Sequence, residues 1–243
     1  MSVITGPTSG RLLLLSTEGF SGHCHPYNSV IQSVASYPLA EPAATAKWRY
    51  SSRFRLPWSY HSAAEYDPIS GMVIVVGSTR GSGEGGMWIY DPLAEKVVGF
   101  VDPVAYSNID NNLVYFPPTG KMYLFVRSGP TVVMELTLDR EDWSKSRATV
   151  VAASGEPPPG GTTGYAYDTR NKVIGGGVSD GKFYAFDPLK KEWSSQVIAL
   201  QSTNGAKLKR VLFHLLDYDP VNNVYIIISG KKTRHTWAYR YKK

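Results

Sequence analysis

Two histidines near the start of the chain have the spacing best suited to holding a metal ion. His23 and His25 lie two residues apart, so their rings point to the same side of an extended segment. Imidazole is the commonest side-chain ligand of transition metals. A copper or zinc site needs further ligands, and the remaining histidines are His61, His214 and His235. Because no Asp or Glu cluster accompanies them, we expect hydrogen-bonding loop histidines, with a metal site at His23 and His25 as the alternative.

The acidic residues do not form the pairs that hydrolytic chemistry needs. Glycoside cleavage uses two carboxyl groups that face each other across the bond. The candidates fall one to a loop: Glu18, Glu84, Asp102, Asp110, Glu156 and Asp180. The glycine-rich segment 81–86 is not followed by a helical pattern, so it lacks the helix N-terminus that binds phosphate. We therefore expect no catalytic residues and no cofactor.

Alternating arginine and aromatic residues in segment 53–60 could contact a ligand. Arg55 and Trp58 belong to the sequence RFRLPWSY, in which rings and guanidinium groups could stack on a sugar or hold a protein partner. The other interpretation is an ordered loop that covers its own part of the fold, and we favour it.

A turn motif recurs along the chain and defines its organisation. Tyr66-Asp67-Pro68 lies between two apolar runs and is followed by Gly71. Equivalent turns centre on Phe116, Asp168 and Asp219, and the intervals between the four positions are 49, 52 and 51 residues. The glycine position is expected to hold Gly120, Asn171 and Asn223, because glycine and asparagine tolerate a positive φ.

A second motif, an aromatic strand that ends in a turn, follows in each unit. It reads Trp88-Ile89-Tyr90-Asp91-Pro92 in one unit and Phe183-Tyr184-Ala185-Phe186-Asp187-Pro188 in another. The sequence from Thr236 to Tyr239 matches it near the end of the chain. We expect the repeated aspartates to cap turns and the tryptophans to pack between units.

This double motif resembles the kelch-type β-propeller repeat of the galactose-oxidase-like central domain, in which four-stranded sheets of about fifty residues pack radially. The resemblance implies an all-β, five-bladed kelch-like β-propeller with four antiparallel strands per blade. One domain would contain blades at residues 1–58, 59–104, 105–155, 156–204 and 205–243. The family's paired glycines survive only at Gly175-Gly176-Gly177. Blade count and spacing differ from those of the copper oxidase of this family, so its activity is not inferred.

The last blade is expected to have three strands, over residues 213–218, 224–229 and 236–241. The alternation of Trp237, Tyr239 and Tyr241 with charged residues predicts a half-buried edge strand. Such an edge could pair with another chain.

The longer connections of the repeat are expected on one face of the propeller, where binding residues concentrate. We name this the long-loop face, and its candidate binding residues are His23, His25, Tyr27, Arg55, Trp58, His61, Arg80, Asn111, Arg127, Asp180, His214, Lys231, Arg234 and His235.

Composition and charge limit what the protein binds and where it acts. The 243 residues carry a formal net charge of +6. No nucleic-acid-binding motif accompanies the basic residues, so we do not expect the protein to bind nucleic acid. The single cysteine, Cys24, excludes an internal disulfide. No segment has the apolar length of a membrane span or of a signal peptide. We expect a protein of the cytoplasm or of an assembled particle.

These observations favour a non-catalytic interaction module that binds a protein partner or a glycan through the long-loop face, as part of a larger assembly. One alternative is a small metal-dependent or glycan-active enzyme. Another is a structural or host-recognition protein of a phage virion or tail.

Overall fold

The computed structural model describes residues 2–6, 11–16, 33–38, 49–51, 63–78, 85–101, 111–126, 129–160, 164–198, 215–229 and 235–242. For residues before 63 it describes the backbone alone. The chain divides into two compact units, residues 1–115 with 136–148 and residues 116–135 with 149–243.

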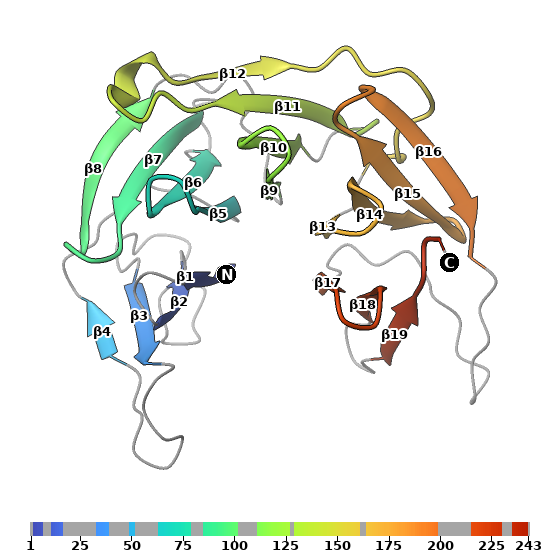
Figure 1. Ribbon diagram of the computed structural model, residues 1–243, viewed down its shortest axis with the longest axis horizontal. Coiled ribbons are helices and arrows are strands. Elements are labelled where there is room, and N and C mark those ends of the chain that lie inside the picture. Colours follow the sequence, from blue (N-terminus) through green and yellow to red (C-terminus); the bar gives the residue numbers. More distant parts are fainter. Residues whose placement is uncertain are drawn as a thin grey trace. The chain divides into compact units, whose positions relative to one another are not determined.

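The secondary structure is almost entirely β (Figure 1). The first sheet contains β1 (Ser2–Gly6), β2 (Arg11–Ser16), β3 (Ser33–Pro38) and β4 (Arg49–Ser51). The second contains β5 (Ala63–Asp67), β6 (Met72–Ser78), β7 (Gly85–Asp91) and β8 (Lys96–Val101). The third contains β9 (Asn112–Phe116), β10 (Lys121–Val126), β11 (Val132–Thr137) and β12 (Arg147–Val150). The fourth contains β13 (Tyr165–Asp168), β14 (Val173–Ser179), β15 (Lys182–Asp187) and β16 (Glu192–Val197). The fifth contains β17 (Leu215–Asp219), β18 (Val224–Ser229) and β19 (His235–Tyr239).

Each sheet is a meander that falls within one predicted repeat. Strands pair in chain order throughout, and a sheet of three strands comes last, as predicted. Four sheets have four strands each, so the expectation of five blades is corrected to four full blades and one sheet with three strands among the described residues. The helical structure of the described residues is one 3₁₀ turn, η1 (Trp143–Lys145), and no helix among them could span a membrane.

The tight turns explain the repeat spacing. In the second sheet the Gly71 N–H donates to the Asp67 carbonyl at 2.8 Å, and Gly71 has φ 75°. The fourth sheet has the same bond from Lys172 to Asp168 at 2.8 Å, with φ 56° at Lys172. The positive-φ residue there is therefore Lys172, and the prediction of Asn171 was wrong by one position. Asn171 instead donates its side-chain amide to the Asp168 carboxylate at 2.7 Å.

The turns into the outer strands depend on aspartate, as predicted. Asp91 Oδ1 accepts the N–H groups of Leu93 and Ala94 at 2.8 and 2.9 Å. Asp187 Oδ1 accepts the equivalent pair in the fourth sheet at 3.0 and 3.1 Å. Their role is to satisfy turn amides that no strand can reach.

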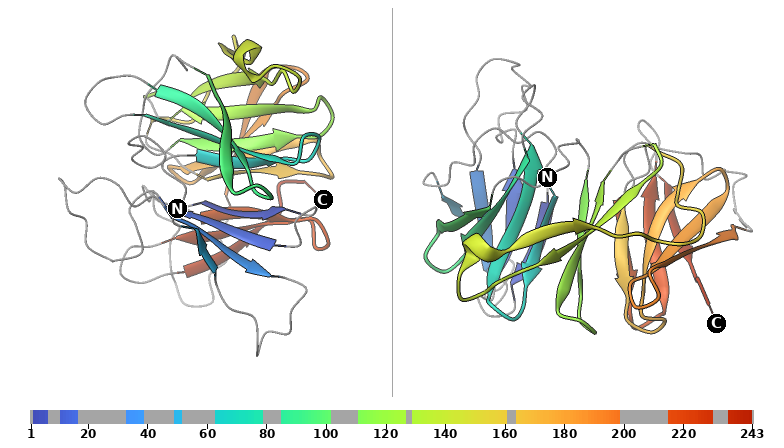
Figure 2. Two further views of the ribbon diagram at one scale, coloured as in Figure 1. Left: turned by 90° about the vertical axis from the view of Figure 1, so that its left-hand side faces the viewer. Right: turned by 90° about the horizontal axis from the view of Figure 1, so that it is seen from above.

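Packing between neighbouring sheets supplies the apolar core. In the unit that contains the fourth and fifth sheets, β13 and β17 lie side by side, and Figure 2 shows the two sheets stacked. Their shared cluster is built around Phe183 and Tyr225, both fully buried, with ring centroids 4.7 Å apart. Gly175 allows this approach, because a Cβ there would overlap the Tyr225 hydroxyl and lie 2.8 Å from Phe183 Cε1. One of the predicted glycine positions is therefore a packing requirement.

Candidate binding surface

Most residues of the predicted long-loop face lie outside the part of the chain that the structure describes. These are His23, His25, Tyr27, Arg55, Trp58, His61, Arg80, Arg127, His214, Lys231 and Arg234. The prediction of a metal site at His23 and His25 lies outside it too. Among the residues described, no group of three or more His, Cys, Asp and Glu side chains could hold a metal ion.

Three residues of that face are described, each beside its own strand or turn. Asn111 is half-buried directly before β9. Asp180 is exposed in the turn between β14 and β15, where it has φ 51° and accepts the Ser179 hydroxyl at 3.2 Å. His235 is half-buried at the start of β19, with its ring 6.4 Å from that of Trp237. The long-loop face as a whole stays a prediction.

One buried ion pair joins the second sheet to the connection before η1. Asp67 is 0% exposed and binds Arg140 through Nε at 2.8 Å and Nη2 at 3.0 Å. Ser70 also donates to the Asp67 carboxylate, at 2.6 Å. Burial alone would raise the pKa of Asp67, but the hydrogen bonds from Arg140 and Ser70 and the guanidinium charge outweigh burial and lower it. These contacts give Asp67 a structural role, and sequence reasoning did not identify Arg140.

A second charged cluster crosses the third sheet. The Lys121 ammonium binds Glu135 Oε1 at 2.6 Å, and the Tyr123 hydroxyl donates to Oε2 at 2.9 Å. Burial opposes ionisation of Glu135, but the bonds from Lys121 and Tyr123 prevail and lower its pKa. Burial, followed by the hydrogen bond to Glu135, raises the pKa of Tyr123. Glu135 thus binds both other side chains, which fits a cross-strand support rather than a reactive group.

Among the described residues, the edge of the fifth sheet differs from the outer edges of the second and fourth sheets. β19 pairs with β18 in antiparallel register, and no other described strand pairs with it. By contrast, segment 151–156 lies on the edge of β16, where Ser154 accepts the Trp193 N–H at 2.9 Å and donates to the Lys191 carbonyl at 2.9 Å. In the second sheet, Trp143 of η1 packs against Gly99 of β8. Connecting segments therefore cover parts of two outer strands.

The fourth sheet shows which backbone groups of its third strand, β15, point towards the outer strand β16. Phe186 of β15 lies opposite Trp193 of β16, and Trp193 donates its N–H away from that pair, to Ser154. The two residues therefore form a non-hydrogen-bonded pair. Ala185, the preceding residue, must then bond across to Ser194 of the outer strand.

The register of the fifth sheet carries this pattern over to β19. In the fourth sheet, Ile174 comes two residues after the positive-φ residue Lys172 and lies opposite Phe186. In the fifth sheet, Tyr225 comes two residues after the positive-φ residue Asn223 and lies opposite Tyr239. Ala238 therefore matches Ala185, and its N–H and C=O point away from β18. By the alternation of a strand, those of Thr236 do the same. These groups form the outward edge of β19.

Two aromatic side chains lie along this edge. Trp237 and Tyr239 are half-buried, whereas Thr236 and Ala238 between them are exposed. The Tyr239 ring lies 4.5 Å from that of Phe183, and its hydroxyl donates to Gln196 Oε1 of β16 at 3.1 Å. Trp237 and Tyr239 therefore share the face of β19 that meets the fourth sheet.

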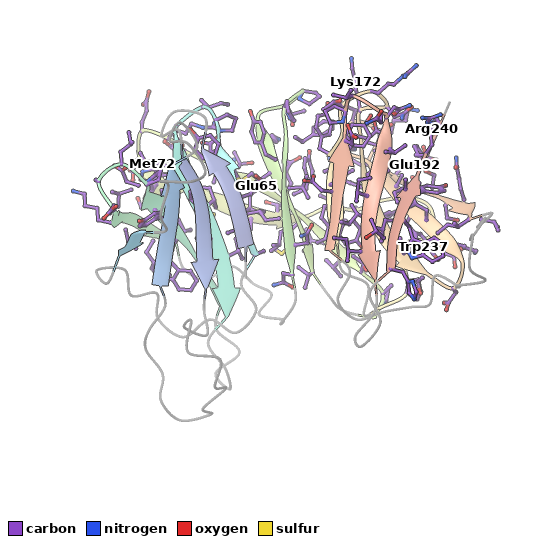
Figure 3. All side chains as sticks on the ribbon, turned by 90° about the horizontal axis from the view of Figure 1, so that it is seen from below. Glu65, Met72, Lys172, Glu192, Trp237 and Arg240 are labelled. Atoms are coloured by element: carbon purple, nitrogen blue, oxygen red, sulfur yellow. The ribbon has the colours of Figure 1, made fainter. Side chains whose placement is uncertain are left out.

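The chain after β19 does not turn back along the edge. Arg240 and Tyr241 occupy the two positions that hold Asp and Pro before the outer strands of the second and fourth sheets. Arg240 donates to the carbonyls of Asn223 and Asn222 at 3.3 and 3.0 Å, and Tyr241 is buried with its hydroxyl 2.9 Å from Ser194 Oγ. Figure 3 shows Arg240 near the end of the sheets that carries Lys172, and Trp237 towards the opposite end. Side-chain contacts thus hold this segment to the turn of its own sheet and to β16.

One of two similar solved structures identifies the fold of the chain. The β-propeller domain of Cps50 (Swd1) from Myceliophteria thermophila matches with a TM-score of 0.53 and 10% identity, over 97% of this chain and 64% of that one. An auxiliary nutrient binding protein from Bacteroides thetaiotaomicron VPI-5482 matches with a TM-score of 0.48 and 10% identity, over 93% of this chain and 65% of that one. The chain thus spans slightly less than two thirds of each. No family model and no curated protein matches the sequence. The chain has the fold of an all-β propeller, and the kelch-type resemblance stays a prediction from the turn motifs.

Proposed function

We propose that the chain is a non-catalytic β-propeller domain that binds a protein partner, and that the outward edge of β19 holds that partner. The chain would form a single kelch-like domain of four full blades, with β17–β19 as its additional three-stranded sheet. The observation that carries the proposal is the strand count, since four sheets have an outer fourth strand and the last has none among the described residues.

A strand edge has the groups required for main-chain recognition. The N–H and C=O groups of Thr236 and Ala238 point outward in one row, and an extended peptide can bond to such a row as an added strand. Outer strands in the second and fourth sheets show that the same position accepts a strand in this chain. Protein recognition therefore has a defined geometry here, and the long-loop face offers a second surface for it.

Blocking the edge without disturbing the sheet tests this proposal. Ala238→Pro removes an outward N–H, leaves the bonds between β18 and β19 in place, and puts proline where edge strands tolerate it. Ala238→Val keeps the N–H and is the matched control. Extended peptides are selected on the wild-type protein from a displayed random library. They should bind the valine variant as tightly as the wild type, and the proline variant at least about tenfold more weakly, which corresponds to a loss of about 1.4 kcal/mol.

The rival interpretations predict different results. If the selection yields no peptide, or peptides that bind the proline variant as well as the wild type, the edge is not the partner site. Hits on a glycan array would instead support carbohydrate recognition through the long-loop face. Stoichiometric copper or zinc that is lost in a His23→Ala variant would overturn the non-catalytic interpretation in favour of a metal-dependent enzyme.

A further inference from the structure

We infer that the strand that docks on β19 is an acidic, extended segment of another protein, with apolar side chains at alternate positions, bound antiparallel to β19. The inference rests on the proposed function and specifies the chemistry of the partner.

The apolar positions follow from the second sheet, whose third strand carries the same two aromatic residues. Trp88 and Tyr90 of β7 occupy the register positions of Trp237 and Tyr239. Outer strand β8 places Phe100 opposite Trp88, with ring centroids 5.3 Å apart, and Val97 opposite Tyr90. The register shifts between Ile89 and Tyr90, so these two residues are three positions apart on β8, whereas a partner in regular register places their equivalents two positions apart.

With β8 in place, Trp88 is 5% exposed and Tyr90 is fully buried, whereas their equivalents on β19 are only half-buried. A docked strand would complete this burial. Cross-strand pairs between aromatic and β-branched or aromatic residues are among the favourable ones in sheets. The partner should therefore carry an apolar residue opposite Tyr239 and a second one, two positions later, opposite Trp237.

The acidic character follows from the basic residues that flank β19 in the sequence. Arg240 and Lys242 follow β19 directly, and Lys231, Lys232 and Arg234 precede it in the sequence. β19 ends at Tyr239, so the residues that precede the first apolar residue of an antiparallel partner would extend past the end of the strand towards Arg240 and Lys242, both of which are exposed. Asp or Glu at these positions would be attracted to them, and a basic partner would be repelled.

The same charges argue against two other occupants. A second copy of the chain, paired antiparallel about Trp237, would place Arg240 opposite Arg234 and Lys242 opposite Lys232. Segment 199–214 of this chain contains three Lys or Arg residues and no acidic residue, so it lacks the complementary charge. An acidic segment of a different protein satisfies both the apolar and the charged positions.

Three synthetic peptides test the inference directly. The probe is Asp-Ser-Asp-Val-Thr-Phe-Thr, blocked at both ends and labelled for fluorescence anisotropy. One control replaces both aspartates by lysine, and the other replaces valine and phenylalanine by alanine. We expect the charge control to bind about tenfold more weakly at low salt, and the alanine control about 30-fold more weakly. Binding of the probe should weaken between about 50 and 300 mM salt.

Amide exchange then locates the site. The probe should slow hydrogen exchange at Thr236 and Ala238, and Ala238→Pro should abolish binding while Ala238→Val retains it. If both control peptides bind as tightly as the probe and protect the same amides, the inferred chemistry is wrong although strand docking holds. If the probe binds without changing exchange on β19, docking at the edge is refuted and the proposed function fails with it.

Two further outcomes also overturn the inference. The first is an absence of probe binding up to about 1 mM, which corresponds to a binding free energy weaker than about 4 kcal/mol. The second is self-association of the unliganded protein that Ala238→Pro abolishes, because a second copy would then occupy the edge.

Discussion

Replacing Asp67 by asparagine should destabilise the protein far more than the same change in another Asp-Pro turn. The carboxylate is fully buried and accepts two bonds from Arg140 and one from Ser70, whereas an amide group cannot neutralise the guanidinium charge. Breaking a buried ion pair costs about 3–5 kcal/mol. The Arg140 side chain is 26% exposed and can recover some hydration in the variant. We therefore expect Asp67→Asn to lower the free energy of unfolding by about 2–3 kcal/mol at neutral pH.

The matched control is Asp91→Asn. Among the described residues, Asp91 accepts the local amides of Leu93 and Ala94, and an amide oxygen can still accept them, so the expected loss is under about 0.5 kcal/mol. The free energy of unfolding, measured by urea denaturation of both variants and the wild type, compares the two turns. Equal losses in the two variants would refute the argument that the Arg140 contact makes Asp67 distinct.

The pH dependence provides a second test of the same contact. The pKa of Asp67 is lowered in the folded state, so the folded protein binds its proton at lower pH than the unfolded chain does. The stabilisation should be fully present above the unfolded value of about 3.9 and should be lost as pH falls through the folded pKa. The difference in unfolding free energy between wild type and Asp67→Asn should therefore shrink below about pH 4. A difference that stays constant there would contradict the assignment.

Three further substitutions test the packing and the second charged cluster by the same denaturation measurement. Gly175→Ala should cost about 1–3 kcal/mol, because the added methyl group overlaps the buried Tyr225, and a neutral effect would contradict that packing. Trp193→Ala should cost about 3–5 kcal/mol since the ring is 5% exposed and packs on three other rings, while Val197→Ala on the same strand, 77% exposed, should change stability by less than about 0.5 kcal/mol. Glu135→Gln should cost about 1 kcal/mol of stability at neutral pH, because it removes the charge that Lys121 and Tyr123 bind. This loss should fade as pH falls below about 4. An equal loss at pH 3 and pH 7 would contradict the role of the Glu135 charge.

The repeat could be predicted because its turns depend on local chemistry. Asp-Pro pairs and positive-φ residues act within four or five positions of one another, so their spacing directly marks the strand boundaries. The error at Asn171 has the same local origin. Lysine seldom adopts a positive φ, and the asparagine beside it was the better candidate on residue type alone. Only the bond from Lys172 to Asp168 shows which residue closes the turn.

Contacts between distant segments left no comparable signal in the sequence. Arg140 and Asp67 are 73 residues apart, and nothing near Arg140 indicates that its guanidinium is bound. The three strands of the last sheet were predicted from the sequence pattern. The direction of its backbone groups needed the register of β18 and β19 and the bond from Trp193 to Ser154.

Hydrogen exchange of the unliganded protein, followed residue by residue by NMR, tests the central claim most directly. If the edge of β19 is open, the amide protons of Thr236 and Ala238 exchange rapidly, whereas those of Trp237 and Tyr239, bonded to β18, are protected. Equal protection of all four amides would show that the edge is already paired and would contradict its assignment as the partner site.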